Sequence, residues 1–402
     1  MATLEEQFQQ ACDARDLPGV VLLASDIKGN FTYEKAFGLK NPIDKIGVDA
    51  TFIMASCTKL MTSISALQCV ERGQIGLDDD LSTVLSEFKD IQILTGFKEG
   101  TVDPIHKKAV NKITLRQLLT HSSGLGYDTM NPLLIKWRES RGKEAGQKGD
   151  PILKRITIPL LFEPGTSWEY GYGIDWAGVL VMRLNKMSLE AYMQKYLWDP
   201  LSIRNITFHQ ELKLEVRKNL VKMSTRGKQG MRGLATPTEE KVEWTDELLY
   251  EDPWVDEFGG AGGIGSGVEY MKILHSICAD DGKLLMSETI DEMFTPQLGD
   301  DARRALAVGS VFLDENGMFS SHEPGTERDY GLGGALILSD KRTGLRAGTL
   351  SWSGLPNLLW TIDRESGICL MYASNLVPFG DQKSHEMQQL FEREMYARSS
   401  KL

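Results

Sequence analysis

The chain has 402 residues, of which 41% are hydrophobic and 25% charged, the composition of an ordinary soluble globular protein. Its 45 Lys and Arg against 56 Asp and Glu give a formal net charge of −11, which argues against nucleic acid or an anionic membrane surface as a partner. No apolar run approaches the roughly 18 residues of a membrane-spanning helix, and the acidic N-terminal segment does not resemble a signal peptide. We therefore expect a protein that stays inside the cell and does not insert into membranes.

The cysteines and histidines predict neither a disulfide scaffold nor a metal site. There are five cysteines without a C-x-x-C pair and six histidines without H-E-x-x-H. Cys57 allows two interpretations, a reactive thiol or a small buried hydrophobic residue, and the absence of a nearby histidine in the sequence favours the second. No cofactor is expected.

Apolar periodicity predicts the following elements in chain order. Residues 3–15 are typical of an amphipathic helix, and 20–24 with 31–37 are typical of a β-hairpin around a Gly/Asn turn. Residues 56–71 carry apolar positions at helical spacing, which end at Gly73. Further expected helices span 113–120, 150–162, 173–186, 188–197 and 381–398, and further strands span 333–339, 345–352, 357–363 and 367–374.

Strand-like runs at both ends and a helical middle predict an α/β protein of the α+β type. Its antiparallel sheet would be flanked by helices, its N- and C-terminal strands would pair, and a mostly helical lobe would be inserted. We expect a single unit, 1–402, with the sheet region at about 1–60 plus 245–402 and the helical lobe at about 61–244.

A glycine-rich segment, Gly260-Ala-Gly-Gly-Ile-Gly265, matches the G-x-G-x-x-G pattern of dinucleotide sites. That pattern binds nucleotides only after a buried apolar strand, whereas the preceding residues here are polar and acidic. We therefore predict a structural turn, followed by a helix that Ser266 caps.

One serine has the spacing of an activated nucleophile. The chain lacks the G-x-S-x-G elbow of α/β-hydrolases, but S-x-x-K occurs at Ser25, Ser56 and Ser86. Residues i and i+3 share one helix face, and only Ser56 begins a long apolar helix, on which Lys59 is the only charge before Glu71. The alternative for Ser56 is a plain helix cap.

Two further motifs follow in order: Leu118-Leu-Thr-His-Ser-Ser-Gly-Leu125, and the segment from Phe162 to Gly178 with Pro-Gly and Tyr170-Gly-Tyr172. With Ser56-Cys-Thr-Lys59, the chain resembles the serine β-lactamase and penicillin-binding-protein superfamily through nearly its whole length. Within it, the resemblance is closest to class C β-lactamase-like esterases and acyltransferases, especially the fungal lovastatin esterases and lovastatin/simvastatin acyltransferases. The segment Gly354-Leu-Pro-Asn-Leu-Leu-Trp360 is similar to theirs.

The resemblance implies a catalytic set. Ser56 would be the nucleophile, Lys59 its amine partner and Tyr170 the proton relay, and the adjacent ammonium would stabilise a phenolate at Tyr170. The backbone N–H groups of Ser56 and Leu355 would stabilise the oxyanion.

Two departures from the family pattern put β-lactam hydrolysis and peptidase action in doubt. Tyr172 replaces the Asn of Y-x-N, and Trp352-Ser353-Gly354 replaces K-T-G. Aromatic residues near the motifs suit a bulky lipophilic ester. The residues expected to bind the substrate are Tyr127, Trp168, Tyr172, Asp175, Phe258, Trp352, Ser353 and Gly354.

These observations favour a serine ester hydrolase for a small-molecule, statin- or polyketide-like ester. The alternatives are an acyltransferase that moves a short branched acyl group from a thioester, with a possible acyl-donor protein as partner, and a catalytically silent binding or assembly protein. An intact Ser56, Lys59 and Tyr170 set argues against the silent protein.

The chain ends in Ser400-Lys401-Leu402, a tripeptide that acts as a peroxisomal address at a free C-terminus. We expect recognition by the peroxisomal import receptor and a peroxisomal location. Without import, the protein would be cytoplasmic.

Overall fold

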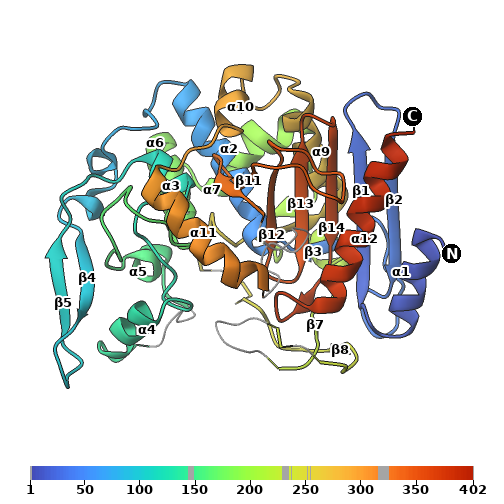
Figure 1. Cartoon of the computed structure of the whole chain (residues 1–402), viewed down its shortest axis with the longest axis horizontal. Helices are drawn as coiled ribbons and strands as arrows, with labels where there is room; N and C mark the ends of the chain where they lie inside the picture. Colours follow the sequence, from blue (N-terminus) through green and yellow to red (C-terminus); the bar gives the residue numbers. More distant parts are fainter. Residues whose placement is uncertain are drawn as a thin grey trace.

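The computed structural model describes residues 2–143, 149–228, 235–236, 238–250, 252–253, 255–315 and 326–401. At its centre lies a seven-stranded antiparallel sheet in the order β10-β11-β12-β13-β14-β1-β2 (Figure 1). These strands are β1 (Gly19–Asp26), β2 (Thr32–Gly38), β10 (Arg328–Tyr330), β11 (Ala335–Ile337), β12 (Leu350–Gly354), β13 (Leu358–Asp363) and β14 (Ile368–Ala373).

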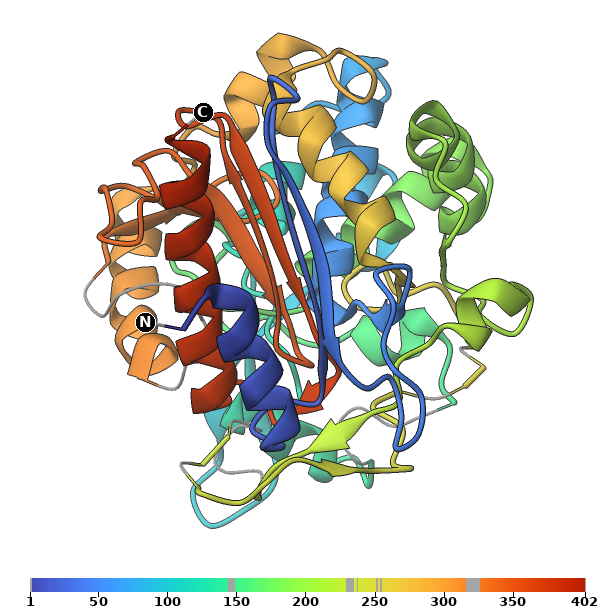
Figure 2. The same ribbon diagram turned by 90° about the vertical axis from the view of Figure 1, so that its right-hand side faces the viewer.

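Both faces of the sheet are buried along its central strands, and the alternation of side chains along β1 shows why. Val20 and Leu22 belong to a core cluster with residues of α1 (Leu4–Asp13) and α12 (Gln382–Ser399). Val21 and Leu23 point to the opposite face, where they join the larger core. Figure 2 shows α1 and α12 together on one side of the sheet.

The larger core holds the helices that position the candidate site. The central one is α2 (Thr58–Glu71), which packs against α6 (Gly173–Asn185), and α9 (Gly267–Ala279) covers β1 and β14. The other α-helices among the described residues are α3 (Leu115–Leu119), α4 (Pro132–Glu139), α5 (Ile152–Ile156), α7 (Leu189–Met193), α8 (Leu214–Lys218), α10 (Ser287–Met293) and α11 (Asp300–Glu315).

Short strands lie outside the main sheet. The hairpin of β4 (Gln92–Phe97) and β5 (Pro104–Lys108) projects from the body at the left of Figure 1. The others form two small three-stranded sheets: β15 (Leu376–Val377), β7 (Ser224–Thr225) and β8 (Glu243–Trp244), and β3 (Thr51–Ile53), β9 (Ile264–Ser266) and β6 (Ile206–Thr207).

The predicted α+β architecture is confirmed, including the pairing of the terminal strands, in which Val21 lies opposite Ala373. Some elements differ from expectation. The helix expected at 150–162 is only Ile152–Ile156, and the strand expected at 345–352 runs from Leu350 to Gly354. The β4–β5 hairpin was not expected in a mostly helical lobe.

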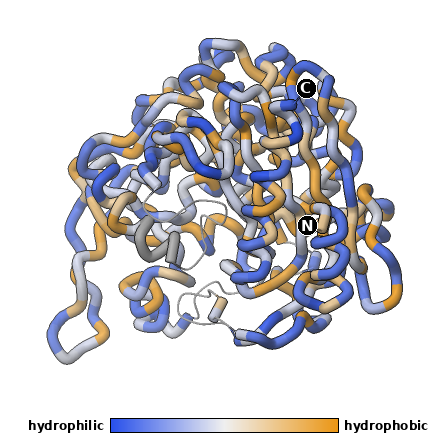
Figure 3. Tube along the Cα trace, turned by 45° about the vertical axis from the view of Figure 1, so that its right-hand side comes forward, coloured by the Kyte–Doolittle hydropathy of each residue, from blue (hydrophilic) through white to orange (hydrophobic). Residues whose placement is uncertain are grey.

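Hydropathy agrees with this layered arrangement. Figure 3 shows hydrophobic stretches along strands of the main sheet. Within the described part of the chain, no helix combines the length and the apolar character needed to cross a membrane.

Candidate active site

Ser56 lies on a strained turn between β3 and α2. The 3-10 turn Ala55–Cys57 leads directly into the helix, and Ala55 has a φ of +44°, a left-handed conformation that side chains with a Cβ rarely adopt. Ala55, Cys57 and Lys59 are buried, whereas Ser56 is partly exposed. The turn thus leaves the Ser56 hydroxyl accessible on an otherwise buried segment.

Lys59 lies one helical turn after Ser56 and is only 1% exposed. Its Nζ donates to Ser56 Oγ at 3.1 Å, to the Tyr127 hydroxyl at 2.9 Å and to the Gly260 carbonyl at 2.6 Å. These three acceptors match the three protons of an ammonium. The predicted Ser56–Lys59 contact is therefore present, and Tyr127 bonds Lys59.

Tyr170 completes the group around Ser56. Its hydroxyl lies 2.6 Å from Ser56 Oγ, and the Trp352 indole N–H donates to the same phenol oxygen at 3.3 Å. Lys59 Nζ lies 4.8 Å from the centroid of the Tyr170 ring. The Tyr170 oxygen is therefore placed to exchange a proton with Ser56 Oγ.

The glycine-rich segment is a tight structural loop packed on α2. Thr62 donates to the Gly259 carbonyl at 2.7 Å, and the Gly263 N–H donates to Thr58 Oγ1 at 2.9 Å. A Cβ at Gly260 would lie 2.3 Å from Asp175 Oδ2, so only glycine fits there. Ser266 occupies the N-cap position of α9, but its side chain makes no capping hydrogen bond.

The end of β12 lies beside the Ser56 turn. A Cβ at Gly354 would lie 2.6 Å from the Met54 carbonyl oxygen and 3.2 Å from Cys57 Sγ. Trp352 and Ser353 precede this contact on the strand, and Leu355, which is 39% exposed, follows it directly. The backbone N–H of Leu355 as an oxyanion donor is consistent with this placement and stays a prediction.

Tyr172 and Asp175, both expected to bind the substrate, are buried, and their polar atoms bond to neighbouring protein groups. The Tyr172 hydroxyl donates to Asp128 Oδ1 at 2.7 Å, and Asp128 is paired with Arg138 at 2.5 Å. Burial and the Asp128 charge raise the pKa of the Tyr172 phenol, which keeps it a donor. Asp175 is 2% exposed and accepts from the Gly260 N–H. Both residues support the site from inside.

Aromatic rings surround Tyr170, and two contributors were not expected. His121 lies 4.7 Å from Tyr170 between ring centroids, and Tyr330 lies 5.3 Å from His121 and 5.4 Å from Trp352. Burial and the Lys59 charge hold the pKa of the His121 imidazole well below its usual value. The position of His121 in the Thr-His-Ser-Ser-Gly motif could have identified it as a site residue, whereas no sequence pattern indicated Tyr330.

The other residues expected to contact the substrate are mostly covered by protein. Trp168 is buried, with its ring 6.1 Å from those of His121 and Tyr330. Phe258 is buried under Arg155, whose guanidinium carbon lies 4.5 Å from the ring centroid.

The interpretation of Cys57 as a small buried residue agrees with the structure. It is fully buried, burial raises the pKa of its thiol, and its backbone carbonyl accepts from the Tyr270 hydroxyl. A thiol that is neither accessible nor ionised is a poor nucleophile.

One cluster with metal-ligand chemistry lies outside the Ser56 group. The ligand atoms of Glu190, His209 and Glu257 all lie within 4.8 Å of one another. Each already has protein partners: Glu190 accepts from the Phe208 N–H, and His209 bonds Glu257 at 3.0 Å. The residues are far apart in sequence, so spacing rules did not reveal them.

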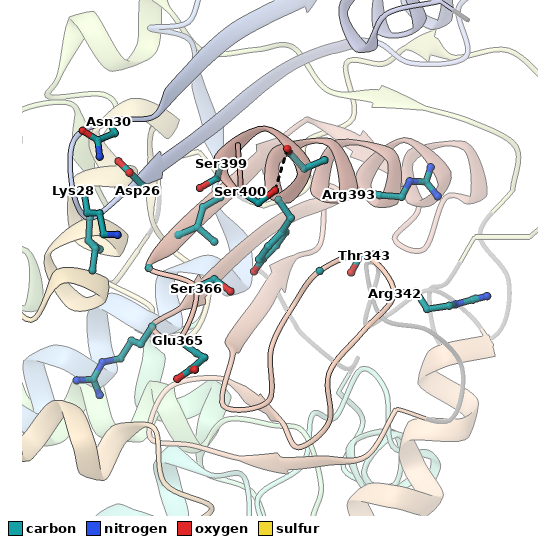
Figure 4. Close-up of a pocket in the computed structure, with 17 residues that line it drawn as sticks. Asp26, Lys28, Asn30, Arg342, Thr343, Glu365, Ser366, Arg393, Ser399 and Ser400 are labelled. Atoms are coloured by element: carbon teal, nitrogen blue, oxygen red, sulfur yellow. Dashed lines mark hydrogen bonds between the residues drawn. The ribbon is translucent and has the colours of Figure 1, made fainter. Parts of the chain in front are cut away.

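A cavity of about 710 Å³ lies at the other end of the main sheet (Figure 4). It is lined by the β1–β2 turn, the β13–β14 turn and the end of α12, including Lys28, Glu365, Arg393 and Ser400. None of its lining residues belongs to the Ser56 group, so this cavity is separate from the candidate site.

Comparison with known proteins agrees with this geometry. The chain is 35% identical to the lovastatin esterase of Penicillium rubens, over 99% of this chain and 98% of the relative. It is 33% identical to the monacolin J acid methylbutanoyltransferase of Aspergillus terreus, over 98% and 95% of the two chains. A mutant of simvastatin synthase from Aspergillus terreus has the same fold, with a TM-score of 0.90, 32% identity, and coverage of 99% of this chain and 95% of that one.

These relatives are named as an esterase and as acyl-transferring enzymes, and the chain is likewise an enzyme of this serine ester hydrolase and acyltransferase type. The family model described as Beta-lactamase matches residues 2–392. The protein therefore belongs to the beta-lactamase family.

Proposed function

We propose that this protein is a serine esterase that cleaves the acyl ester of a bulky, lipophilic, statin-like alcohol through an acyl-enzyme on Ser56. The observation that carries the proposal is the position of Ser56 Oγ, 2.6 Å from the Tyr170 hydroxyl and 3.1 Å from Lys59 Nζ. A hydroxyl held between a phenol and an ammonium is an activated nucleophile in this family's chemistry.

In the proposed acylation step, Ser56 Oγ attacks the ester carbonyl and its proton passes to the Tyr170 oxygen. Lys59 and the Trp352 indole N–H stabilise the phenolate that accepts this proton. The backbone N–H groups of Ser56 and Leu355 hold the developing oxyanion. Tyr170 then returns the proton to the departing alcohol oxygen, which leaves the acyl group on Ser56.

In deacylation a water molecule attacks the same carbonyl, Tyr170 accepts its proton, and Ser56 is released with that proton. Hydrolysis requires one ordered water near Tyr170, whereas transfer requires a bound second alcohol and exclusion of water. The esterase from Penicillium rubens, similar over almost the full chain, supports hydrolysis.

Acyl transfer is the second candidate, and the similarity to the Aspergillus terreus methylbutanoyltransferase favours it. The same acyl-enzyme would form from a thioester, and a polyketide alcohol would take the place of water. The names of both relatives support a statin-type alcohol and a short branched acyl group as the substrate class.

The experiment that separates the two functions supplies a lovastatin-type ester alone, and then the free alcohol with a short-chain acyl thioester. Faster cleavage of the ester supports the esterase. If acylation of the alcohol exceeds ester cleavage by tenfold, a barrier difference of about 1.4 kcal/mol, the transferase replaces it.

We further propose import into peroxisomes where Ser400-Lys401-Leu402 forms the free C-terminus. Ser400 caps α12, and both Ser400 and Lys401 are exposed, while Leu402 lies outside the described residues. A fluorescent reporter with this tail should enter peroxisomes, and one without Leu402 should stay cytosolic. A diffuse signal from the intact tail would contradict the proposal.

A further inference from the structure

Asp175 and Lys59 both hydrogen bond to Gly260 of the glycine-rich loop, Asp175 at its N–H and Lys59 at its carbonyl. Asp175 Oδ1, in the first turn of α6, accepts from the Gly260 N–H at 2.9 Å. The Gly260 carbonyl accepts from Lys59 Nζ at 2.6 Å. A single loop residue therefore links a buried carboxylate to the buried amine beside Ser56.

The close approach of Asp175 to this loop depends on glycine. A Cβ at Gly260 would lie within 3.0 Å of all three atoms of the Asp175 carboxyl group. Asp175 thus lies directly against the backbone that receives the Lys59 hydrogen bond, and any movement of its carboxylate moves that acceptor.

The buried charge of Lys59 also indicates a link to Asp175. Among the described residues, the three acceptors of the Lys59 hydrogen bonds are all neutral groups, although the amine is buried. A buried ammonium needs a compensating negative charge nearby. Burial raises the pKa of Asp175, and Lys59 is the charge that most opposes this rise. The titratable and charged side chains that interact with Asp175 are Lys59, Arg155, Tyr127, Tyr172 and Tyr250.

We propose that Asp175 is the positioning residue and counter-ion of Lys59: it holds the Gly260 carbonyl against Nζ and supplies the negative charge that compensates the buried amine beside Ser56 and Tyr170. This inference rests on the proposed serine mechanism. Asp175 touches neither the substrate nor the reacting atoms, and it acts through Gly260 and Lys59.

Loss of the Asp175 charge should shift the pH profile of kcat/KM in one defined direction. Each limb of the kcat/KM profile marks gain or loss of a proton in the proposed group of Ser56, Lys59 and Tyr170. Removal of a neighbouring negative charge favours loss of protons in both steps. Both limbs of kcat/KM should therefore move to lower pH without Asp175, by about one pH unit for one buried charge a few ångströms away.

The test uses two substitutions at Asp175, with a chromogenic short-chain ester as the probe. Asp175→Asn keeps an acceptor for the Gly260 N–H and deletes the charge, whereas Asp175→Glu keeps the charge on a longer side chain. Asp363→Asn is the matched control, because Asp363 is also fully buried and accepts backbone N–H bonds. It lies at the end of β13 away from the Ser56 turn, whereas the start of β13 pairs with Gly354 beside that turn. Thermal unfolding first establishes that each variant is folded.

We expect both limbs to shift down in Asp175→Asn, and to stay at the wild-type pH in Asp175→Glu and Asp363→Asn, whatever their kcat. Folded Asp175→Asn with unshifted limbs overturns the proposal. If Asp175→Asn does not fold, Asp175→Ser takes its place, because it also deletes the charge: limbs shifted to lower pH are required, and unshifted limbs in the folded variant overturn the proposal. Activity in Ser56→Ala would instead refute the serine mechanism, so the two failures are distinguishable.

Discussion

The hydroxyl oxygens of Ser56 and Tyr170 lie 2.6 Å apart, although the two residues are 114 positions apart in the chain. The contact joins the turn before α2 to the segment before α6, and these two helices pack against each other in the larger core. The same packing places Lys59 between Ser56 and the Gly260 carbonyl. The proposed mechanism therefore uses Ser56, Lys59 and Tyr170 as one proton-transfer unit, which the following predictions test.

Removal of either partner of Ser56 should nearly abolish turnover. We expect Lys59→Ala and Tyr170→Phe each to lower kcat by about a hundredfold or more, the usual size of a general acid–base contribution. Because the residues act as a unit, the double variant should be little worse than the poorer single variant. Steady-state kinetics of all three variants would show this, and losses that multiply would mean that the two residues act independently.

Trp352→Phe tests the indole hydrogen bond to Tyr170. The substitution keeps an aromatic ring and deletes the donor at 3.3 Å, so kcat should fall by roughly fivefold, about 1 kcal/mol. Trp360→Phe is the control, because the Trp360 indole N–H is buried without a partner among the described residues. The control should lose stability and keep kcat; an unchanged kcat in Trp352→Phe would show that the hydrogen bond is not used.

Acid stability should depend on the link between α1 and α12. Arg398 hydrogen bonds lower the pKa of Glu5 from 4.5 to about 2. A carboxylate whose pKa is depressed in the folded protein stabilises it above pH 4.5, and this contribution is lost as the pH falls toward 2. Glu5→Gln should therefore be less stable than wild type at pH 6, with the difference vanishing near pH 2. Denaturant unfolding at several pH values measures it, and a pH-independent difference would contradict this linkage.

Chelation should leave turnover unchanged. The proposed mechanism uses side chains and backbone N–H groups alone, and the cluster of Glu190, His209 and Glu257 is bonded to other protein groups. Activity measured after dialysis against EDTA should equal that of the untreated enzyme. Loss of activity that zinc restores would show that this cluster or another site holds a functional metal.

The local part of the site was predictable, because the i, i+3 spacing of Ser56 and Lys59 brings them together in the turn that leads into α2. Tyr170 came from the family resemblance. The Gly260 carbonyl, the His121 ring and the bond from Trp352 to Tyr170 were not predictable, since they depend on how distant segments pack. Tyr172 and Asp175 were expected to contact the substrate because they flank a motif, and motif position does not tell an inward from an outward side chain.

The fold, too, was predictable where the sequence pattern is strong and local, and not elsewhere. Continuous apolar runs predicted β1 and β14, which are buried on both faces of the sheet. The β4–β5 hairpin was missed because β5 is mostly exposed and polar, so it lacks the hydrophobic pattern of a strand. Gly354 was expected to lie beyond its strand, yet it ends β12, where it pairs with Leu358 of β13.

The most direct test of the Ser56 mechanism is mass spectrometry of the acid-quenched enzyme after incubation with a short-chain activated ester, followed by peptide mapping. We predict one acyl group on the peptide that carries Ser56, retained in Cys57→Ala and in the Ser86→Ala control from another S-x-x-K segment, and absent in Ser56→Ala. An acyl group that persists in folded Ser56→Ala, or that disappears in folded Cys57→Ala, would contradict the account.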